Sequence, residues 1–344
     1  MDAVAYDGLV LLSGSEVASM SELIVLDGGA GRELARMGAP FRQPEWSALA
    51  LMEGPDFVTR MHERFIAAGA DVITTNSYAV VPFHIGSARF ADRGEALADL
   101  AGRLARQAAA SAAGAGVGAT RAAGAAGTDA AGAGRPVKVA GSLPPACGSY
   151  RADLFRPDEA RPILQTLVRG LAPYVDHWQA ETLSAIEEAE LVREVLDAAD
   201  GPSRPLWLSF TLEDEADRGG EPRLRSGQPA NDAVAAAIQL GAEAVLFNCS
   251  QPEAMGDAVA AARRVIEAAG VKVKIGVYAN AFPPQSKDAA ANANLHDIRT
   301  DLNPLAYLAF AQAWQRTGAS ILGGCCGIGP EHIAVLRQGL TQVD

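Results

Sequence analysis

The chain has 344 residues, of which 49% are hydrophobic and 20% are charged, and its formal net charge is −12. This composition is that of a globular protein with room for one large α/β barrel or two ordinary domains. The negative charge argues against nucleic acid as a partner, since phosphate binding requires clustered Lys and Arg side chains.

The low number of cysteines and the lack of a long apolar run indicate the cellular compartment in which we expect the protein. The four cysteines are too few for a disulfide scaffold in a chain of this length, so we expect a reducing compartment. The sequence contains no run of 18 or more strongly apolar residues, so we predict no membrane span. Residues 1–20 lack the basic start and the apolar core of a signal peptide, so we expect a cytoplasmic protein.

Short apolar runs alternate with longer segments of helical spacing from residue 23 onward. Strands buried on both faces read as nearly continuous apolar runs, and such runs occur at 23–27, 71–75, 137–141, 177–181, 206–211, 244–248, 273–278 and 320–323. Helical spacing occurs at 57–68, 157–171, 185–198, 231–240, 252–268, 304–316 and 330–340. This alternation predicts an α/β protein with a single (β/α)8 TIM barrel. An open doubly wound sheet is the alternative, but no Gly-x-Gly-x-x-Gly fingerprint follows any of these strands.

One stretch departs from the alternation. Residues 108–134 consist almost wholly of Ala, Gly, Thr and Ser. From Gly114 onward glycine is too frequent for a helix, and the side chains are too small to pack. We therefore predict one barrel domain, residues 1–344, with a flexible Ala/Gly-rich insertion at about 114–135.

Polar or sulfur-bearing residues recur where the predicted strands end. Because the catalytic residues of such barrels gather at the carboxyl-terminal ends of the strands, these residues predict one lined pocket. They are Asp27, Thr75, Asn76, Ser142, Glu181, Thr211, Glu213, Asn248, Cys249, Asn280, Cys325 and Cys326.

Three of these residues are cysteines that suit a metal. Cys249 ends the sixth predicted strand, and Cys325 and Cys326 end the eighth within the run Gly323-Gly324-Cys325-Cys326-Gly327. Soft sulfur ligands favour zinc, with Zn–S distances of roughly 2.3 Å. Three thiolates leave one position open, and a metal removes the proton of an incoming thiol. The pattern therefore predicts alkyl transfer to a thiol; the alternative is that the cysteines are merely buried.

Two acids fit a thiol substrate that is an amino acid. Asp27 and Glu181 end strands that we place opposite the cysteines, and both would pair with an ammonium group, although Asp27 would also suit a turn. Amides of Gly28, Gly29 and Ala30 would hold a carboxylate. Asn248, beside a proposed metal ligand, would orient the site. The loop containing Thr75 and Tyr78 supplies hydroxyl groups, and the ring of Tyr78 would either cover the site or pack.

We do not expect the other potentially reactive residues to belong to the site. We expect His177 to be a packed core histidine and Cys147 not to be a ligand. The strand lysines that a Schiff-base aldolase would need, Lys138, Lys272 and Lys274, lie near strand starts, at the wrong end of the barrel. Residues 213–215 are interpreted as a solvated loop.

Taken together, these motifs resemble those of the homocysteine S-methyltransferases over nearly the whole chain. The motifs are Leu26-Asp27-Gly28-Gly29, Gly69-Ala70-Asp71-Val72-Ile73-Thr74-Thr75-Asn76-Ser77-Tyr78, Gly141-Ser142-Leu143-Pro144-Pro145, Glu181-Thr182, Asn248-Cys249 and Gly323-Gly324-Cys325-Cys326-Gly327. The resemblance implies a TIM barrel with Zn²⁺ held by Cys249, Cys325 and Cys326, and homocysteine sulfur as the fourth ligand. It also implies that Asp27 and Glu181 hold the substrate amino group, with Thr75 nearby. The Ala/Gly-rich insertion and Cys147 depart from the pattern.

The expected reaction is methyl transfer from a sulfonium or ammonium donor to zinc-bound homocysteine, which forms methionine. S-methylmethionine is the first choice of donor, followed by S-adenosylmethionine and betaine; a cobalamin- or folate-fed reaction is less expected, since no second domain is seen to carry either. The rival hypotheses are a non-catalytic zinc-binding or thiol-sensing barrel and a metal-free lyase or aldolase. The sequence leaves open whether the chain forms a homo-oligomer.

Overall fold

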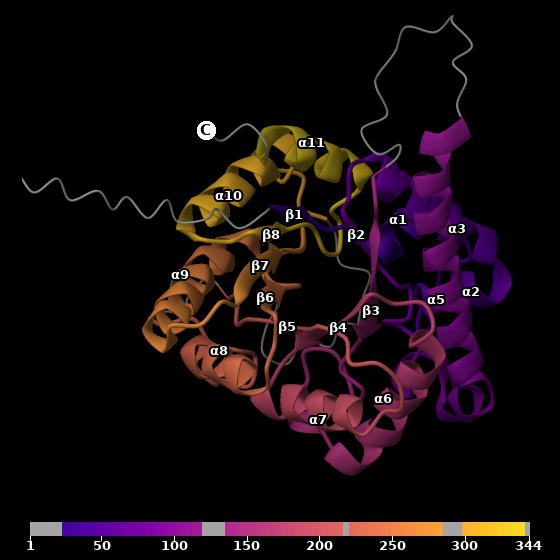
Figure 1. Cartoon of the computed structure of the whole chain (residues 1–344), viewed down its shortest axis with the longest axis horizontal. Helices are drawn as coiled ribbons and strands as arrows, with labels where there is room; N and C mark the ends of the chain where they lie inside the picture. The colour runs from indigo at the N-terminus through magenta and orange to yellow at the C-terminus, as the bar shows by residue number, and fades with distance from the viewer. Residues whose placement is uncertain (1–22, 119–134, 216–219, 285–297, 341–344) are drawn as a thin grey trace, which may run out of the picture.

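The computed structural model describes residues 23–118, 135–215, 220–284 and 298–340. Eight parallel strands form one sheet in the order β1-β8-β7-β6-β5-β4-β3-β2. A parallel bridge between Leu26 and Val72 joins the two edges, and the Asp27 amide donates to the Val72 oxygen at 3.0 Å. Figure 1 shows a ring of strands inside a ring of helices, which confirms the predicted (β/α)8 barrel. The strands are β1 Ile24–Val25, β2 Val72–Thr74, β3 Lys138–Leu143, β4 His177–Leu183, β5 Leu206–Phe210, β6 Ala244–Asn248, β7 Lys274–Tyr278 and β8 Ile321–Leu322.

Helices cover the outside of the barrel, and several of them begin with a proline. Proline suits the first helical turn because its missing N–H group has no intrahelical partner there. The α-helices are α1 Ala30–Arg36, α2 Ala48–Glu53, α3 Pro55–Ala67, α4 Pro82–Ile85, α5 Ser87–Gly118, α6 Pro157–Leu171, α7 Ile186–Asp197, α8 Ala230–Gln239, α9 Pro252–Ala269, α10 Pro304–Thr317 and α11 Pro330–Leu340. The short helices α1, α2 and α4 escaped sequence prediction because they are too short to show a helical period.

Side chains fill the middle of the barrel. Eight buried residues form this inner cluster: Leu26, Val72, Ala140, Trp207, Ala244, Leu246, Tyr278 and Ile321. His177 packs beside Trp207 with ring centroids 4.0 Å apart, and burial lowers the pKa of its imidazole to about 4, which confirms the prediction of a core histidine. Because the interior is packed, a ligand-sized cavity is expected at the mouth of the barrel.

The predicted element bounds differ from the structure in three places. Strand β4 continues two residues past the predicted end at Glu181, and β8 is only two residues long. Helix α5 runs through Gly118, beyond the predicted onset of the insertion at Gly114. The rest of the predicted flexible insertion, residues 119–134, lies outside the described residues.

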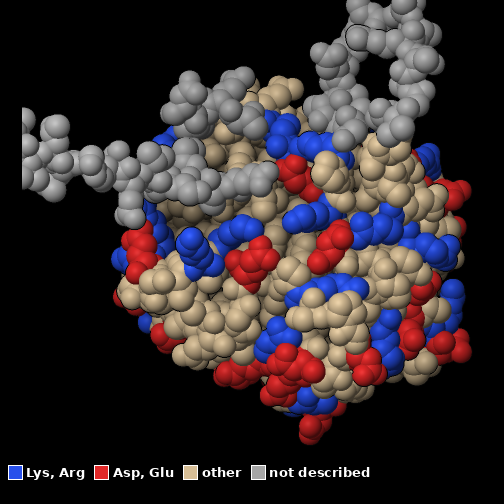
Figure 2. Space-filling model, viewed as in Figure 1, with Lys and Arg blue, Asp and Glu red and all other residues tan. Residues whose placement is uncertain are grey.

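Charge is mixed on the surface that Figure 2 shows. Lys and Arg side chains alternate there with Asp and Glu side chains instead of forming a continuous basic area. Among the described helices, none combines the length and the hydrophobicity that a membrane crossing requires.

Candidate active site

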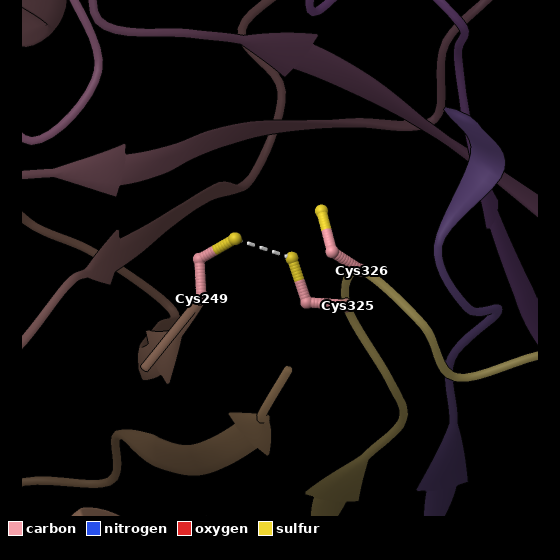
Figure 3. A group of neighbouring side chains, drawn as sticks. All are labelled: Cys249, Cys325 and Cys326. Carbon is pink, nitrogen blue, oxygen red and sulfur yellow. Dashed lines mark hydrogen bonds between the residues drawn. The ribbon is translucent and has the colours of Figure 1, made fainter. Parts of the chain in front are cut away.

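The three predicted cysteines meet at the mouth of the barrel. Cys249 directly follows β6, and Cys325 and Cys326 follow β8. The sulfur atoms of Cys249 and Cys325 are 2.7 Å apart, and all three sulfurs lie within 4.8 Å of one another. Figure 3 shows the three side chains pointing into one space from two strand ends. Three sulfurs at this spacing can act as ligands of one metal ion.

The turn that carries the cysteine pair depends on glycine. Gly327 has a φ angle of 87°, which is in the region that favours glycine. Gly29, in the loop after β1, lies so close to the pair that an added Cβ would be 2.5 Å from the Cys325 carbonyl oxygen. The loop after β1 therefore packs directly under the cysteine turn.

The environment of the three thiols favours a single thiolate among them, because the pKa values of Cys249 and Cys325 are raised whereas that of Cys326 is lowered. Hydrogen bonding by the Cys249 and Cys325 thiols, followed by the positive charge of Arg32, places the pKa of the Cys326 thiol well below its usual value. A thiolate among two further sulfurs is an attractive site for a soft cation.

Both predicted acids lie in the cavity beside the thiols. Asp27 accepts hydrogen bonds from the Thr74 amide at 2.7 Å and the Thr74 hydroxyl at 3.1 Å. Glu181 accepts from the Ser142 hydroxyl and, at 3.3 Å, from the Tyr278 hydroxyl. Burial raises the pKa of each carboxyl group to about 7, and the charges of nearby groups add to the rise: Glu181 for Asp27, and Cys249 for Glu181.

The position of Asp27 corrects one expectation. We placed this acid opposite the cysteines, but β1 pairs with β8, and the Gly324 amide donates to the Asp27 carbonyl oxygen at 3.0 Å. Ring closure makes the first and last strands neighbours. Asp27 therefore lies next to the cysteine pair, whereas Glu181 approaches from β4.

Asn248, predicted to bind substrate and to orient the site, is not among the residues that line the cavity. Its side chain is fully buried. The amide oxygen accepts from the Thr182 amide at 2.9 Å and from the Ser209 hydroxyl at 2.8 Å, and the amide nitrogen donates to the Thr182 hydroxyl at 2.9 Å. Asn248, which directly precedes Cys249, thus connects the end of β6 to β4 and β5.

Some of the remaining groups that we predicted to contact substrate form hydrogen bonds within the protein. The Gly29 amide, predicted to hold a carboxylate, donates instead to the Ile328 oxygen at 2.9 Å. Gly28, Gly29 and Thr75 all line the cavity. The Thr75 hydroxyl accepts from the Ser142 amide at 3.0 Å. Tyr78 forms part of the wall, with its hydroxyl 2.6 Å from that of Ser149.

Among the lining residues that sequence reasoning missed, five have side chains that bear most on ligand binding. Four are aromatic, and the fifth, Arg32, is the only Lys or Arg that lines this cavity in the described part of the chain; the five are Arg32, Trp46, Tyr150, Tyr278 and Phe282. Trp46 and Tyr150 have positive φ angles of 50° and 66° and lie outside the strands, so no strand pattern marks them. The signal for Arg32 was its place just after the glycine-rich turn that follows β1.

Residues outside the cavity bear on the other expectations. The Cys147 sulfur lies 3.8 Å from the Arg156 oxygen and is not in the group of three thiols. Lys274, at the start of β7, pairs with Glu243 at 2.6 Å, far along the strand from the mouth. Asp214 contradicts the solvated-loop prediction: its side chain is buried and pairs with Arg225 at 3.0 Å.

Fold and site together define a (β/α)8 barrel whose mouth holds three converging cysteine thiols and two buried carboxyl groups. Comparison with known proteins assigns this class to a family. The homocysteine S-methyltransferase family model matches residues 24–340. The chain belongs to the homocysteine S-methyltransferase family.

Individual relatives agree with this assignment. A homocysteine S-methyltransferase of Escherichia coli is 31% identical, with 92% of this chain and 94% of that protein aligned. A selenocysteine Se-methyltransferase of Brassica oleracea is 28% identical, over 94% and 92% of the two chains. The crystal structure of the E. coli homocysteine methyltransferase MmuM in its metallated form matches with a TM-score of 0.69 at 26% identity, over 92% of this chain and 96% of that one.

Proposed function

We propose that this protein transfers a methyl group from S-methylmethionine to the thiol of homocysteine. One S–CH3 bond of the donor breaks while a new one forms on the acceptor sulfur, and the acceptor thiol loses its proton. Both products are then methionine. The observation that carries the proposal is that three cysteine thiols and two buried carboxyl groups line a single cavity.

The acids suit the ammonium group of an amino acid. Asp27 and Glu181 are almost fully buried, and leaving them charged without a cation is unfavourable. A bound ammonium group would compensate both charges and would hold the acceptor in one orientation. Such positioning is the main contribution that a protein makes to an in-line displacement.

Arg32 is placed to bind a substrate carboxylate. It lines the same cavity, and its guanidinium carbon lies 5.6 Å from the centre of the Phe282 ring. Arginine forms two parallel hydrogen bonds with a carboxylate. The cavity thus offers negative groups for the ammonium end of an amino acid and a positive group for its other end.

The donor set fits zinc. The three sulfurs are soft ligands within 4.8 Å of one another, and the low pKa of the Cys326 thiol favours metal binding. Zinc held by Cys249, Cys325 and Cys326 would offer a fourth position and would lower the pKa of a thiol bound there.

Aromatic side chains favour a cationic donor. Trp46, Tyr78 and Tyr150 line the cavity, and aromatic faces attract cations such as a sulfonium group. S-methylmethionine carries such a sulfonium cation. S-adenosylmethionine and betaine are the next candidates, in that order.

A donor panel tests the proposal. Zinc-loaded protein is incubated with homocysteine and one of the three donors, and methionine is measured. We expect S-methylmethionine to react fastest, with two methionines formed per donor consumed. Cys147→Ala should retain this turnover and Cys326→Ala should lose it. Faster turnover with another donor would overturn the donor choice, and no turnover with any donor in fully zinc-loaded protein would overturn the acceptor as well.

The proposal also includes the domain and the cellular compartment in which the reaction takes place. We treat residues 1–344 as one homocysteine-binding barrel domain that works in a reducing, cytoplasmic environment. The four cysteines are unpaired in the structure, and residues of β4 and of the segments after β1, β6 and β8 line one cavity.

A further inference from the structure

A buried ion pair lies behind the cysteine cluster. Asp214 follows β5, and Arg225 lies on the returning segment of the same loop, where Leu224 bridges to Leu212. Their side chains are 0% and 2% exposed, and their charged atoms are 3.0 Å apart. Burying two charges costs desolvation energy that their attraction offsets only with good geometry, so such a pair is weak support for stability by itself.

Arg225 connects this pair to the carbonyl group of Cys249 through Tyr150. The guanidinium carbon of Arg225 lies 4.4 Å from the centre of the Tyr150 ring. The hydroxyl group of Tyr150 donates to the Cys249 carbonyl oxygen at 3.2 Å. Tyr150 itself has a φ angle of 66°, so contacts made by its side chain help to hold an unfavourable backbone conformation.

Asp214 fixes the chain on the other side of Cys249. One carboxylate oxygen of Asp214 accepts from the Gln251 amide at 3.0 Å, while the other accepts from Arg225. In return, the Gln251 side chain donates to the Asp214 carbonyl oxygen at 2.9 Å. The residue two positions after Cys249 is therefore bound to the same ion pair that supports Tyr150.

The segment between these two contacts needs such support. Cys249 has a φ angle of 52°, a conformation that a non-glycine residue adopts at an energetic cost. The position of the Cys249 sulfur, 2.7 Å from that of Cys325, therefore depends on contacts that hold this turn.

We infer that the buried Asp214–Arg225 pair is a positioning device that holds Cys249 in its strained turn, so that the three thiols are arranged for the metal before it binds. The inference rests on the metal site of the proposed function and adds two positioning residues to it. Groups that orient metal ligands without touching the metal typically contribute 10- to 100-fold in metal affinity.

Zinc affinity measured by competition with a chelator tests the inference. Asp214→Asn should bind zinc roughly 10- to 100-fold more weakly than the original protein. Arg225→Lys keeps the charge but loses the planar group over the Tyr150 ring. Its zinc affinity should lie between those of the original protein and Asp214→Asn. Lys274→Met serves as the matched control, because it removes an ion pair near the other end of the barrel and should leave zinc affinity unchanged.

Two further measurements separate positioning from a general loss of stability. Tyr150→Phe keeps the ring but removes the hydrogen bond to Cys249, so it should weaken zinc binding with little change in the Tm of the metal-free protein. This variant also decides the matter if Asp214→Asn fails to fold. Zinc affinity within twofold of the original protein in Tyr150→Phe and in any folded Asp214→Asn would overturn the inference. Failure of the original protein to bind zinc would instead overturn the proposed function.

Discussion

Burial sets the protonation of the two acids that line the cavity. The pKa of Glu181 is about 7 in the folded chain, compared with an ordinary value of 4.5. The folded chain therefore holds this proton more tightly than the unfolded chain does, and the free energy of unfolding falls as pH rises from about 4.5 to about 7. The total for this group is roughly 3 kcal/mol.

Glu181→Gln removes this cost of ionisation. In metal-free protein, we expect the variant to gain stability relative to the original chain by roughly 2–3 kcal/mol between pH 5 and pH 8, while methyl transfer is lost. Urea unfolding at the two pH values measures the effect, with Glu190→Gln as a control at an exposed position. A stability difference that does not change with pH would show that Glu181 is not ionising in a buried site.

Arg32 makes a separate prediction about substrate recognition. Arg32→Gln should raise the KM for homocysteine roughly 10- to 100-fold, because a hydrogen bond to a charged carboxylate is lost. The decarboxylated acceptor 3-aminopropane-1-thiol has no carboxylate, so its KM should be the same in both proteins. An equal loss with both acceptors would mean that Arg32 acts on the thiols and not on the substrate carboxylate.

At the scale of elements, the site depends on how neighbouring strands are joined. Asn248 at the end of β6 binds residues of β4 and β5, and Thr182 is held there with a φ angle of 61°. Buried donors left without a partner are expensive. The polar side chain that precedes Cys249 therefore connects three strands of the barrel.

Replacing Asn248 should lower both the free energy of unfolding and the affinity for metal. Asn248→Ala leaves the Thr182 amide and the Ser209 hydroxyl without their acceptor, and we expect the free energy of unfolding to fall by roughly 3 kcal/mol. Ser209→Ala removes only one of these bonds and should cost about 1 kcal/mol. Denaturant unfolding of the two metal-free variants measures both values; equal losses would contradict the described role of Asn248.

The elements also show what sequence patterns can predict. Continuous apolar runs located all eight strands because strands covered by helices outside and side chains inside have no solvent-facing positions. Strand ends were less certain, as β4 shows, because a buried polar residue such as Glu181 reads as the end of an apolar run. Asp214 was misread for the related reason that its partner, Arg225, is eleven positions away and no local pattern joins them.

At the scale of the whole molecule, the barrel itself creates the site. Cys249 and Cys325 are 76 positions apart, and they meet because parallel strands direct all their carboxyl ends to one mouth. That convergence could be predicted from the alternation of strands and helices. The aromatic wall could not, because Trp46 and Tyr150 lie on irregular loops whose paths depend on packing against the completed barrel.

The absorption spectrum of the Co²⁺-substituted protein, with and without homocysteine, tests the central claim most directly. We expect one cobalt ion per chain and a sulfur-to-metal charge-transfer band that grows by about one third on addition of homocysteine, as three thiolate ligands become four. Methionine, which has no thiol, should leave this band unchanged. An unchanged band with homocysteine in cobalt-loaded protein would contradict the claim that the three cysteines leave an open position for the acceptor thiol.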